Sequence, residues 1–446
     1  MTTPKAEDGL DGLTELMEHE YVAPAPRGTD PQVRRARRRR GLIIAAVVTT
    51  LVLALAGGYA GWALTVPIDD AVGTSHAPEA PASVAATIAL PTTGASAISI
   101  AGADEYLGPT ASGIWATSGP VDEPRSIASI TKLVTAMVVL DARPLEDDGG
   151  PALTFDKADH ALYDKYYVMG ATIAPMPTGT TLSLRDALAT MLIPSACNYA
   201  EAVAEWAFGS QGAFVGAAKR WLAANGLTHT TIVEPTGIDA RNPSTPADLI
   251  ALGKLAAANP AIAQIAGTRS VTLPGPGTIV NTNTLLGSGG VTGLKTGTLD
   301  DASNLLYTAT LDVGTPTPLT IVGVALGGGS RQAVNDGVLT LLGSIAAGFA
   351  TVPVAEQGQE VGSYSTPWGS GARVVLGEDA SLFTWSDTPI TVDMQTHTPT
   401  TWRDGEVIGS VTWTAGPNTV SVPVELEGGI RPPTAWWRLT HPGELG

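Results

Sequence analysis

The chain has 446 residues and a formal net charge of −17, from 42 acidic and 25 basic residues. Affinity for nucleic-acid backbones needs basic surface, so this balance argues against a nucleic-acid partner. The single cysteine, Cys197, excludes an intrachain disulfide, and the six scattered histidines show no helical metal-ligand spacing. We therefore expect no metal and no other cofactor, and the length predicts two or three structural units.

Six arginines at residues 34–40 directly precede a stretch without any charge, residues 41–68. Residues 42–64 are predominantly apolar and long enough to cross a hydrocarbon core of roughly 30 Å as a helix. Tyr59 and Trp62 lie near the far end, where interfacial aromatic residues belong. Arginines beside a span favour the cytoplasmic side, so we predict a single-pass cell-membrane protein whose N-terminus is cytoplasmic.

This topology leaves the rest of the chain, with most of its negative charge, outside the cytoplasm, where the charge favours solubility. A cleaved signal peptide would need a shorter apolar region closer to the N-terminus. The predicted parts are a cytoplasmic tail at 1–40, a transmembrane helix at 41–66, a linker at 67–90, a catalytic domain at 91–351 and a small β-domain at 352–446.

Residues 91–351 combine strand and helix patterns, which predicts a mixed α/β domain. Apolar positions on one face predict a helix from residue 129 to about 140, and short alternating runs predict strands at 95–101, 303–311 and 318–326. Further helices are predicted at about 183–206, 211–225, 245–257 and 331–348. From 352 onwards, strand-like runs at 373–376, 390–392, 407–413 and 419–424 are separated by turn residues, which predicts an all-β domain.

The first of three short motifs is Ser129-Ile130-Thr131-Lys132. A serine and a lysine three residues apart at the start of a helix lie on the same face, one turn apart. The positive helix N-terminus disfavours a protonated lysine and favours an alkoxide-like serine. This spacing therefore predicts a serine nucleophile activated by a lysine base, although Ser129 alone also suits a helix N-cap.

The other two motifs are Ser195-Ala196-Cys197-Asn198 and Lys295-Thr296-Gly297-Thr298. The Lys-Thr-Gly run precedes an apolar strand, and at a strand edge it offers a cation, a hydroxyl and a close approach of the backbone. These groups suit the free carboxylate at a peptide terminus.

In order and spacing (129, 195 and 295), the three motifs resemble the S-x-x-K, S-x-N and K-T-G set of penicillin-binding proteins and serine β-lactamases. The closer resemblance is to the low-molecular-weight D-alanyl-D-alanine carboxypeptidases. It covers roughly residues 90–350 and includes the stretches 125–136, 182–188, 234–238 and 281–286. It implies an antiparallel sheet with a helical cluster, followed by a small C-terminal β-domain.

The resemblance also implies a role for each motif residue. Ser129 would be acylated, Lys132 would activate it, and Ser195 would relay a proton to the leaving amine. The third motif, Lys295, Thr296, Gly297 and Thr298, would hold the substrate's terminal carboxylate, and the backbone N–H groups of Ser129 and Thr298 would form an oxyanion hole. The implied partners are peptidoglycan stem peptides, with β-lactam antibiotics as acylating inhibitors.

One position departs from the family pattern, because Cys197 stands where the second motif normally has Asn. That amide would contact the catalytic lysine and the substrate, and a thiol is a poor substitute. We count Cys197 and its neighbour Asn198 as candidate substrate-binding residues, although a shift of one residue turns a side chain by about 100° around a helix. A small buried residue without catalytic function and a cysteine nucleophile are alternatives for Cys197, but no histidine partner lies nearby in sequence.

The predicted function is an extracytoplasmic serine DD-carboxypeptidase that removes the terminal D-alanine of stem peptides. A serine β-lactamase is one alternative, with Glu234 as its candidate deacylating carboxylate. A penicillin-binding cell-wall protein with impaired catalysis is another, and Cys197 is the feature that favours it. A transpeptidase is a further alternative, although the chain lacks the large extra domains usual in cell-wall synthases.

Overall fold

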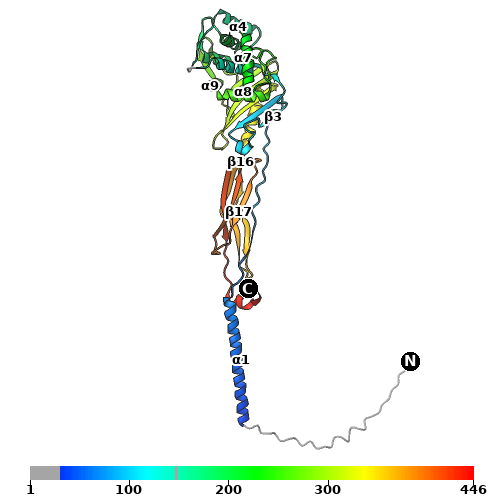
Figure 1. The fold of residues 1–446 in the computed structure, drawn as a ribbon, viewed down its shortest axis with the longest axis vertical. Coiled ribbons are helices and arrows are strands. Elements are labelled where there is room, and N and C mark those ends of the chain that lie inside the picture. Colours follow the sequence, from blue (N-terminus) through cyan, green and yellow to red (C-terminus); the bar gives the residue numbers. More distant parts are fainter. Residues whose placement is uncertain (1–30, 146–148, 446) are drawn as a thin grey trace, which may run out of the picture. The chain divides into compact units, whose positions relative to one another are not determined.

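The structure is a computed structural model that describes residues 31–145 and 149–445 (Figure 1). The described chain divides into two compact units. One contains the long helix α1 (Pro31–Thr65) together with residues 365–371 and 430–445, and the other contains residues 73–364 and 372–429. Most of the predicted tail at 1–40 lies outside the described residues.

Helix α1 begins ten residues before the predicted span, because the arginine-rich run, made of good helix formers, continues the same helix. The helix is long and apolar enough to cross a membrane. Its side chains are exposed along almost the whole length, with Ala63 near the C-terminal end as the buried exception. An apolar helix that buries so little protein surface is suited to a lipid environment.

The second unit is built on a five-stranded antiparallel sheet in the order β10-β11-β12-β2-β3. Strand β11 pairs with β10, where Lys295 lies opposite Leu306, and with β12, where Leu305 lies opposite Ala325. The strand bounds are β2 (Ala95–Ala101), β3 (Ala116–Ser118), β10 (Val291–Leu299), β11 (Ala302–Leu311) and β12 (Leu319–Gly328).

Successive side chains on these strands point to opposite faces, so the sheet separates two hydrophobic cores. Leu305 and Ile321 belong to the core beneath α10 (Arg331–Ala347), whereas Leu306 and Val322 belong to the core beneath the helical cluster. The cluster consists of α3 (Thr131–Ala142), α4 (Lys157–Val168), α5 (Leu184–Leu192), α6 (Cys197–Phe208), α7 (Gln211–Ala224), α8 (Pro246–Ala258) and α9 (Pro260–Ala266). The expected antiparallel sheet with a helical cluster is thus confirmed.

One predicted helix is interrupted. The run at 183–206 forms two helices, α5 and α6, separated by residues 193–196. Pro194 has no N–H to continue the first helix, and Ser195 adopts a left-handed φ of 68°. The break places the second motif in a tight turn instead of inside a helix.

Strands after residue 352 form a second β-sheet system, as the sequence pattern predicts. Six strands lie in the order β1-β14-β15-β19-β18-β17, and β13 pairs with β16. Strand β1 (Val72–Ser75) comes from the segment predicted to be a plain linker. The other bounds are β13 (Phe349–Ala355), β14 (Glu360–Ser365), β15 (Gly371–Leu376), β16 (Ala380–Trp385), β17 (Thr391–Thr396), β18 (Val407–Ala415) and β19 (Asn418–Glu427).

Both sheets belong mainly to one compact unit, and an aromatic cluster joins them. Tyr106 packs edge-on against Phe349 and Phe383, and its hydroxyl oxygen accepts a hydrogen bond from Asn418. The division into a catalytic domain and a β-domain at residue 352 remains a prediction. Shorter elements complete the described fold: α2 (Asp104–Leu107), β4 (Arg125–Ser126) with β7 (Pro243–Ser244), β5 (Ala152–Thr154) with β6 (Thr181–Ser183), β8 (Ser270–Leu273) with β9 (Gly277–Val280), and α11 (Ala435–Thr440).

Candidate active site

Ser129 lies in a single 3₁₀ turn, Ala128–Ile130, that leads directly into α3. Ala128 has a φ of +50°, a left-handed conformation that costs free energy for a residue with a Cβ. The turn leaves Ser129 partly exposed while its neighbours Ile127 and Ile130 are buried. The serine hydroxyl is therefore held at the surface of a rigid core element.

Lys132 lies in the first turn of α3, completely buried, and its Nζ is 3.0 Å from Ser129 Oγ. The same amine donates to the carbonyl oxygen of Thr236 at 2.7 Å and to Cys197 Sγ at 3.3 Å. Three fixed partners orient the amine, and the serine oxygen is one of them. This arrangement can transfer a proton between serine and lysine without moving either residue.

Cys197 is the first residue of α6, and it brings the second motif into contact with the first through Lys132. Ser195 is 5% exposed and lies in the turn just before the helix. Asn198 turns away from this group, because its amide exchanges hydrogen bonds with both the N–H and the C=O of Ala174. The amide thus braces the segment beside α6, and the substrate contact predicted for Asn198 has no counterpart in this geometry.

The third motif lies on β10, beside the nucleophile turn. Gly297 makes this approach possible, because a Cβ at that position would be 2.7 Å from the carbonyl oxygen of Ile127 and 3.3 Å from the backbone nitrogen of Ser129. A residue with a side chain would push the strand away from the nucleophile. The next residue, Thr298, is exposed and follows this point of close approach on β10.

Lys295 is 1% exposed and donates to the carbonyl oxygen of Thr296 at 3.0 Å. Burial lowers its pKa well below the usual 10.5, and the nearby charge of Lys132 lowers it further. Arg331 acts in the same direction, whereas Cys197 opposes the shift. Burial and the neighbouring cations therefore both disfavour the protonated form of Lys295.

Two residues outside the three motifs, Thr282 and Arg331, contact residues of the Lys295–Thr298 motif. Thr282 shares a 2.6 Å hydroxyl hydrogen bond with Thr296, and its N–H donates to the carbonyl oxygen of Ile193, so it ties β10 to the turn before the second motif. Arg331, at the start of α10, reaches Thr298 Oγ1 at 3.4 Å. Sequence reasoning missed Arg331, because a single arginine 33 residues after Thr298 carries no local signal.

Glu234, the candidate deacylating carboxylate, is occupied by its own turn. Its oxygens accept hydrogen bonds from the N–H of Thr236 at 2.7 Å, the N–H of Gly237 at 2.6 Å and the side chain of Asn242 at 2.9 Å. These bonds fix the Thr236 carbonyl that faces Lys132. The carboxylate therefore has a positioning function that the sequence pattern alone did not indicate.

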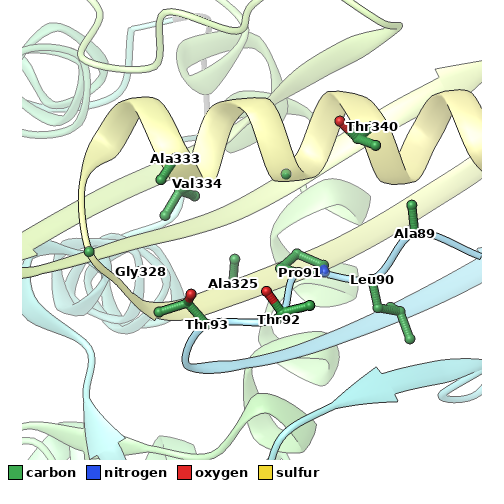
Figure 2. Close-up of a pocket in the computed structure, with 12 residues that line it drawn as sticks. Ala89, Leu90, Pro91, Thr92, Thr93, Ala325, Gly328, Ala333, Val334 and Thr340 are labelled. Atoms are coloured by element: carbon green, nitrogen blue, oxygen red, sulfur yellow. The ribbon is translucent and has the colours of Figure 1, made fainter.

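A separate hollow of about 330 Å³ lies between residues 89–93, the end of β12 and the first turns of α10. Figure 2 shows Ala333 and Val334 on α10, with Thr92 and Thr93 on the segment that leads to β2. None of the motif residues lines it. The hollow and the candidate active site are thus distinct features.

Comparison with known proteins places this geometry in a known group. The family profile described as D-alanyl-D-alanine carboxypeptidase matches residues 95–324. A D-alanyl-D-alanine carboxypeptidase from a Streptomyces strain is 30% identical over 256 residues, which cover 53% of this chain and 84% of that relative. A D-alanyl-D-alanine endopeptidase from Pseudomonas aeruginosa is 36% identical over 126 residues, 28% of this chain, and the match spans only 38% of its length. The crystal structure of penicillin binding protein 6B from Escherichia coli has the same fold, with a TM-score of 0.52 and 21% identity over 78% of this chain and 98% of that one.

Proposed function

Since the chain belongs to the D-alanyl-D-alanine carboxypeptidase family, we propose that it removes the terminal D-alanine from peptidoglycan stem peptides through an acyl-enzyme on Ser129. The observation that best supports this activity is the 3.0 Å contact between Lys132 Nζ and Ser129 Oγ, beside the Lys295–Thr298 strand. A buried amine against a partly exposed serine hydroxyl is the arrangement that an acyl-transfer nucleophile needs.

In the first half-reaction, Ser129 Oγ attacks the carbonyl carbon of the last peptide bond while Lys132 accepts the hydroxyl proton. The oxyanion that forms is stabilised by the backbone N–H groups of Ser129 and Thr298. Ser195 passes a proton to the leaving nitrogen, the C–N bond breaks, and D-alanine departs. In the second half-reaction, water attacks the ester carbonyl and gives a proton to Lys132, which passes it to Ser129 Oγ as the bond between Ser129 and the acyl group breaks. The shortened peptide leaves with the hydroxyl of the water as part of its new carboxylate.

The substrate's terminal carboxylate binds at the open end of β10. Thr298 and Arg331 present a hydroxyl and a guanidinium there, and Lys295 and Thr296 lie behind them. Guanidinium groups bind carboxylates with good geometry, so Arg331 joins the residues inferred from the motifs. This placement favours a peptide with a free C-terminus over an internal peptide bond.

The proposed site of action is the outer side of the cell membrane. Helix α1 supplies the span, and the arginines at its start favour a cytoplasmic N-terminus. Peptidoglycan stem peptides are then accessible to the second unit, and β-lactams acylate the same serine.

Labelled penicillin tests this proposal on the full chain in detergent. Mass spectrometry should place the adduct on Ser129, and D-alanine should be released from a pentapeptide ending in D-Ala-D-Ala. Ser129→Ala should abolish both, whereas Ser126→Ala, a matched change three residues earlier, should retain both. Normal release from Ser129→Ala would refute the assignment.

The same experiment separates the alternatives. Acylation at Ser129 without D-alanine release would identify a penicillin-binding protein with impaired catalysis. Rapid turnover of penicillin that Glu234→Gln slows would identify a β-lactamase. We expect Glu234→Gln instead to slow acylation itself, because Glu234 positions the Thr236 carbonyl against Lys132.

A further inference from the structure

The C-terminal residues of the chain return to the end of α1. Helix α11 (Ala435–Thr440) directs Arg438 to this end, where Nη1 donates to the carbonyl oxygens of Ala63 at 3.2 Å and Val66 at 2.9 Å. Tyr59 on α1 donates its hydroxyl to the carbonyl oxygen of Leu439 at 2.7 Å. Ala63 is fully buried, whereas the rest of α1 is almost entirely exposed.

These contacts form a charged side-chain cap at the C-terminal end of α1. The last four carbonyls of a helix lack partners within it, and the helix dipole makes this end negative. Residues 62–65 include no basic residue, so the positive charge at this end comes from Arg438, more than 370 residues later in the chain. A charged hydrogen bond to these carbonyls gains strength where water is scarce.

The position of this cap along α1 can be derived from helix geometry. Arg40 and Trp62 are 22 residues apart, which at about 1.5 Å per residue makes roughly 33 Å. A hydrocarbon core is roughly 30 Å thick. If the arginines lie at one surface, Trp62 and the carbonyls bound by Arg438 lie at the other.

The exposed side of α11 has the composition of an interfacial surface. Trp436 is 74% exposed, the most exposed tryptophan of the described chain. Trp437 packs against Trp368 at a centroid distance of 5.9 Å and stacks on His441 at 4.9 Å. Tryptophan favours the headgroup region of a bilayer, where an apolar ring and an N–H are both accommodated.

We propose that α11 is a second membrane contact, in which Trp436 enters the headgroup layer of the outer leaflet while Arg438 locks the helix to the end of α1. The proposal rests on the proposed membrane span of α1 and goes beyond it. The chain is then held at the membrane surface by two segments, α1 and α11, that lie more than 360 residues apart in the sequence.

The test uses the full chain in lipid nanodiscs, with a fluorophore attached at Ala435→Cys, next to Trp436. Cys197 is buried, so the unchanged chain serves as the labelling blank. Lipids carrying a nitroxide at the headgroup should lower the fluorescence at least about twofold, as an interfacial position requires. Nitroxides near the end of the acyl chain and aqueous iodide should have smaller effects.

Two substitutions in this labelled chain test the mechanism. Arg438→Ala should reduce the headgroup quenching and increase the iodide quenching, because α11 loses its link to α1. Arg431→Ala, which removes an exposed arginine of the same C-terminal segment, should change neither. Trp436→Ala should resemble Arg438→Ala.

A second label, at Leu53→Cys in the middle of the apolar stretch 42–64 of α1, separates failure of this inference from failure of the span. Quenching of that label by the deep nitroxide shows that α1 crosses the bilayer. If it is quenched while the label at residue 435 responds to iodide alone, α11 does not contact lipid and the inference is wrong. If it is not quenched, the membrane span itself is refuted.

Discussion

Gly237→Ala tests the idea that the Glu234–Gly237 turn fixes the nucleophile. Gly237 has a φ of +79°, and a Cβ there would be 1.9 Å from the carbonyl oxygen of Ala128. Real Cβ atoms essentially never come closer than 3.0 Å to such an atom, so the two segments must separate by about 1.1 Å. Ala128 directly precedes Ser129, and a 1 Å misplacement of a catalytic group can cost about 10²-fold in rate. We therefore expect acylation by labelled penicillin to slow about 10²-fold.

Gly226→Ala is the matched control, since its φ is +73° and no atom lies within 4 Å of an added Cβ. Both variants carry the left-handed penalty of about 1–2 kcal/mol, but only Gly237→Ala carries the clash. Thermal unfolding in detergent and the acylation rate constant should be measured for both. The reasoning fails if Gly237→Ala acylates within about threefold of Gly226→Ala, because a shift of this size at the nucleophile costs far more.

Three further predictions follow from the geometry of the site. Cys197→Asn should raise D-alanine release about tenfold or more with the adduct still on Ser129, because an amide oxygen is a stronger acceptor than Sγ, and an inactive Cys197→Asn would contradict this expectation. Asn198→Ala should instead lower the unfolding temperature, since it removes the hydrogen bonds that hold Ala174. At pH values between the lowered pKa of Lys295 in the folded chain and its usual pKa of 10.5, the unfolded chain binds more protons than the folded chain. The free energy of unfolding should therefore rise with pH in this window. Urea titrations at several pH values should show that Lys295→Met flattens this rise. Ser129→Ala and Lys132→Ala should each abolish acylation, and their double variant should be scarcely worse than either, as expected of residues that act as one unit; additive losses would show that they act separately.

The sequence predicted which side chains of the candidate site lie close together locally, while their roles stay predictions. Ser129 and Lys132 are three residues apart at the start of a helix, so helix geometry alone brings their side chains together. The order of the motifs also identified Lys295 and Cys197 as members of the same group. These motifs can be recognised in the sequence because serine, lysine and cysteine side chains each have a distinct reactivity.

What the sequence could not indicate depends on backbone atoms and on distant contacts. The carbonyl oxygen of Thr236 contacts Lys132 as closely as any side chain does, but a carbonyl is common to every residue and leaves no pattern. Arg331 reaches the site only because β12 leads α10 back to the end of β10. The break between α5 and α6 carried a signal, Pro194, which the apolar periodicity on both sides outweighed.

The three partners of Lys132 explain how a lysine can serve as the base in a buried site. As an ammonium ion it has three N–H donors, which Ser129 Oγ, Thr236 O and Cys197 Sγ accept. As a neutral amine it has two donors and a lone pair, which match the two other acceptors and the Ser129 hydroxyl as donor. Both protonation states are therefore satisfied by the same atoms, and only the serine proton changes its place. Because the surroundings need no rearrangement during such a transfer, we expect a stronger acceptor than Cys197 at this position to change the rate of the proposed reaction while Ser129 remains the acylated residue.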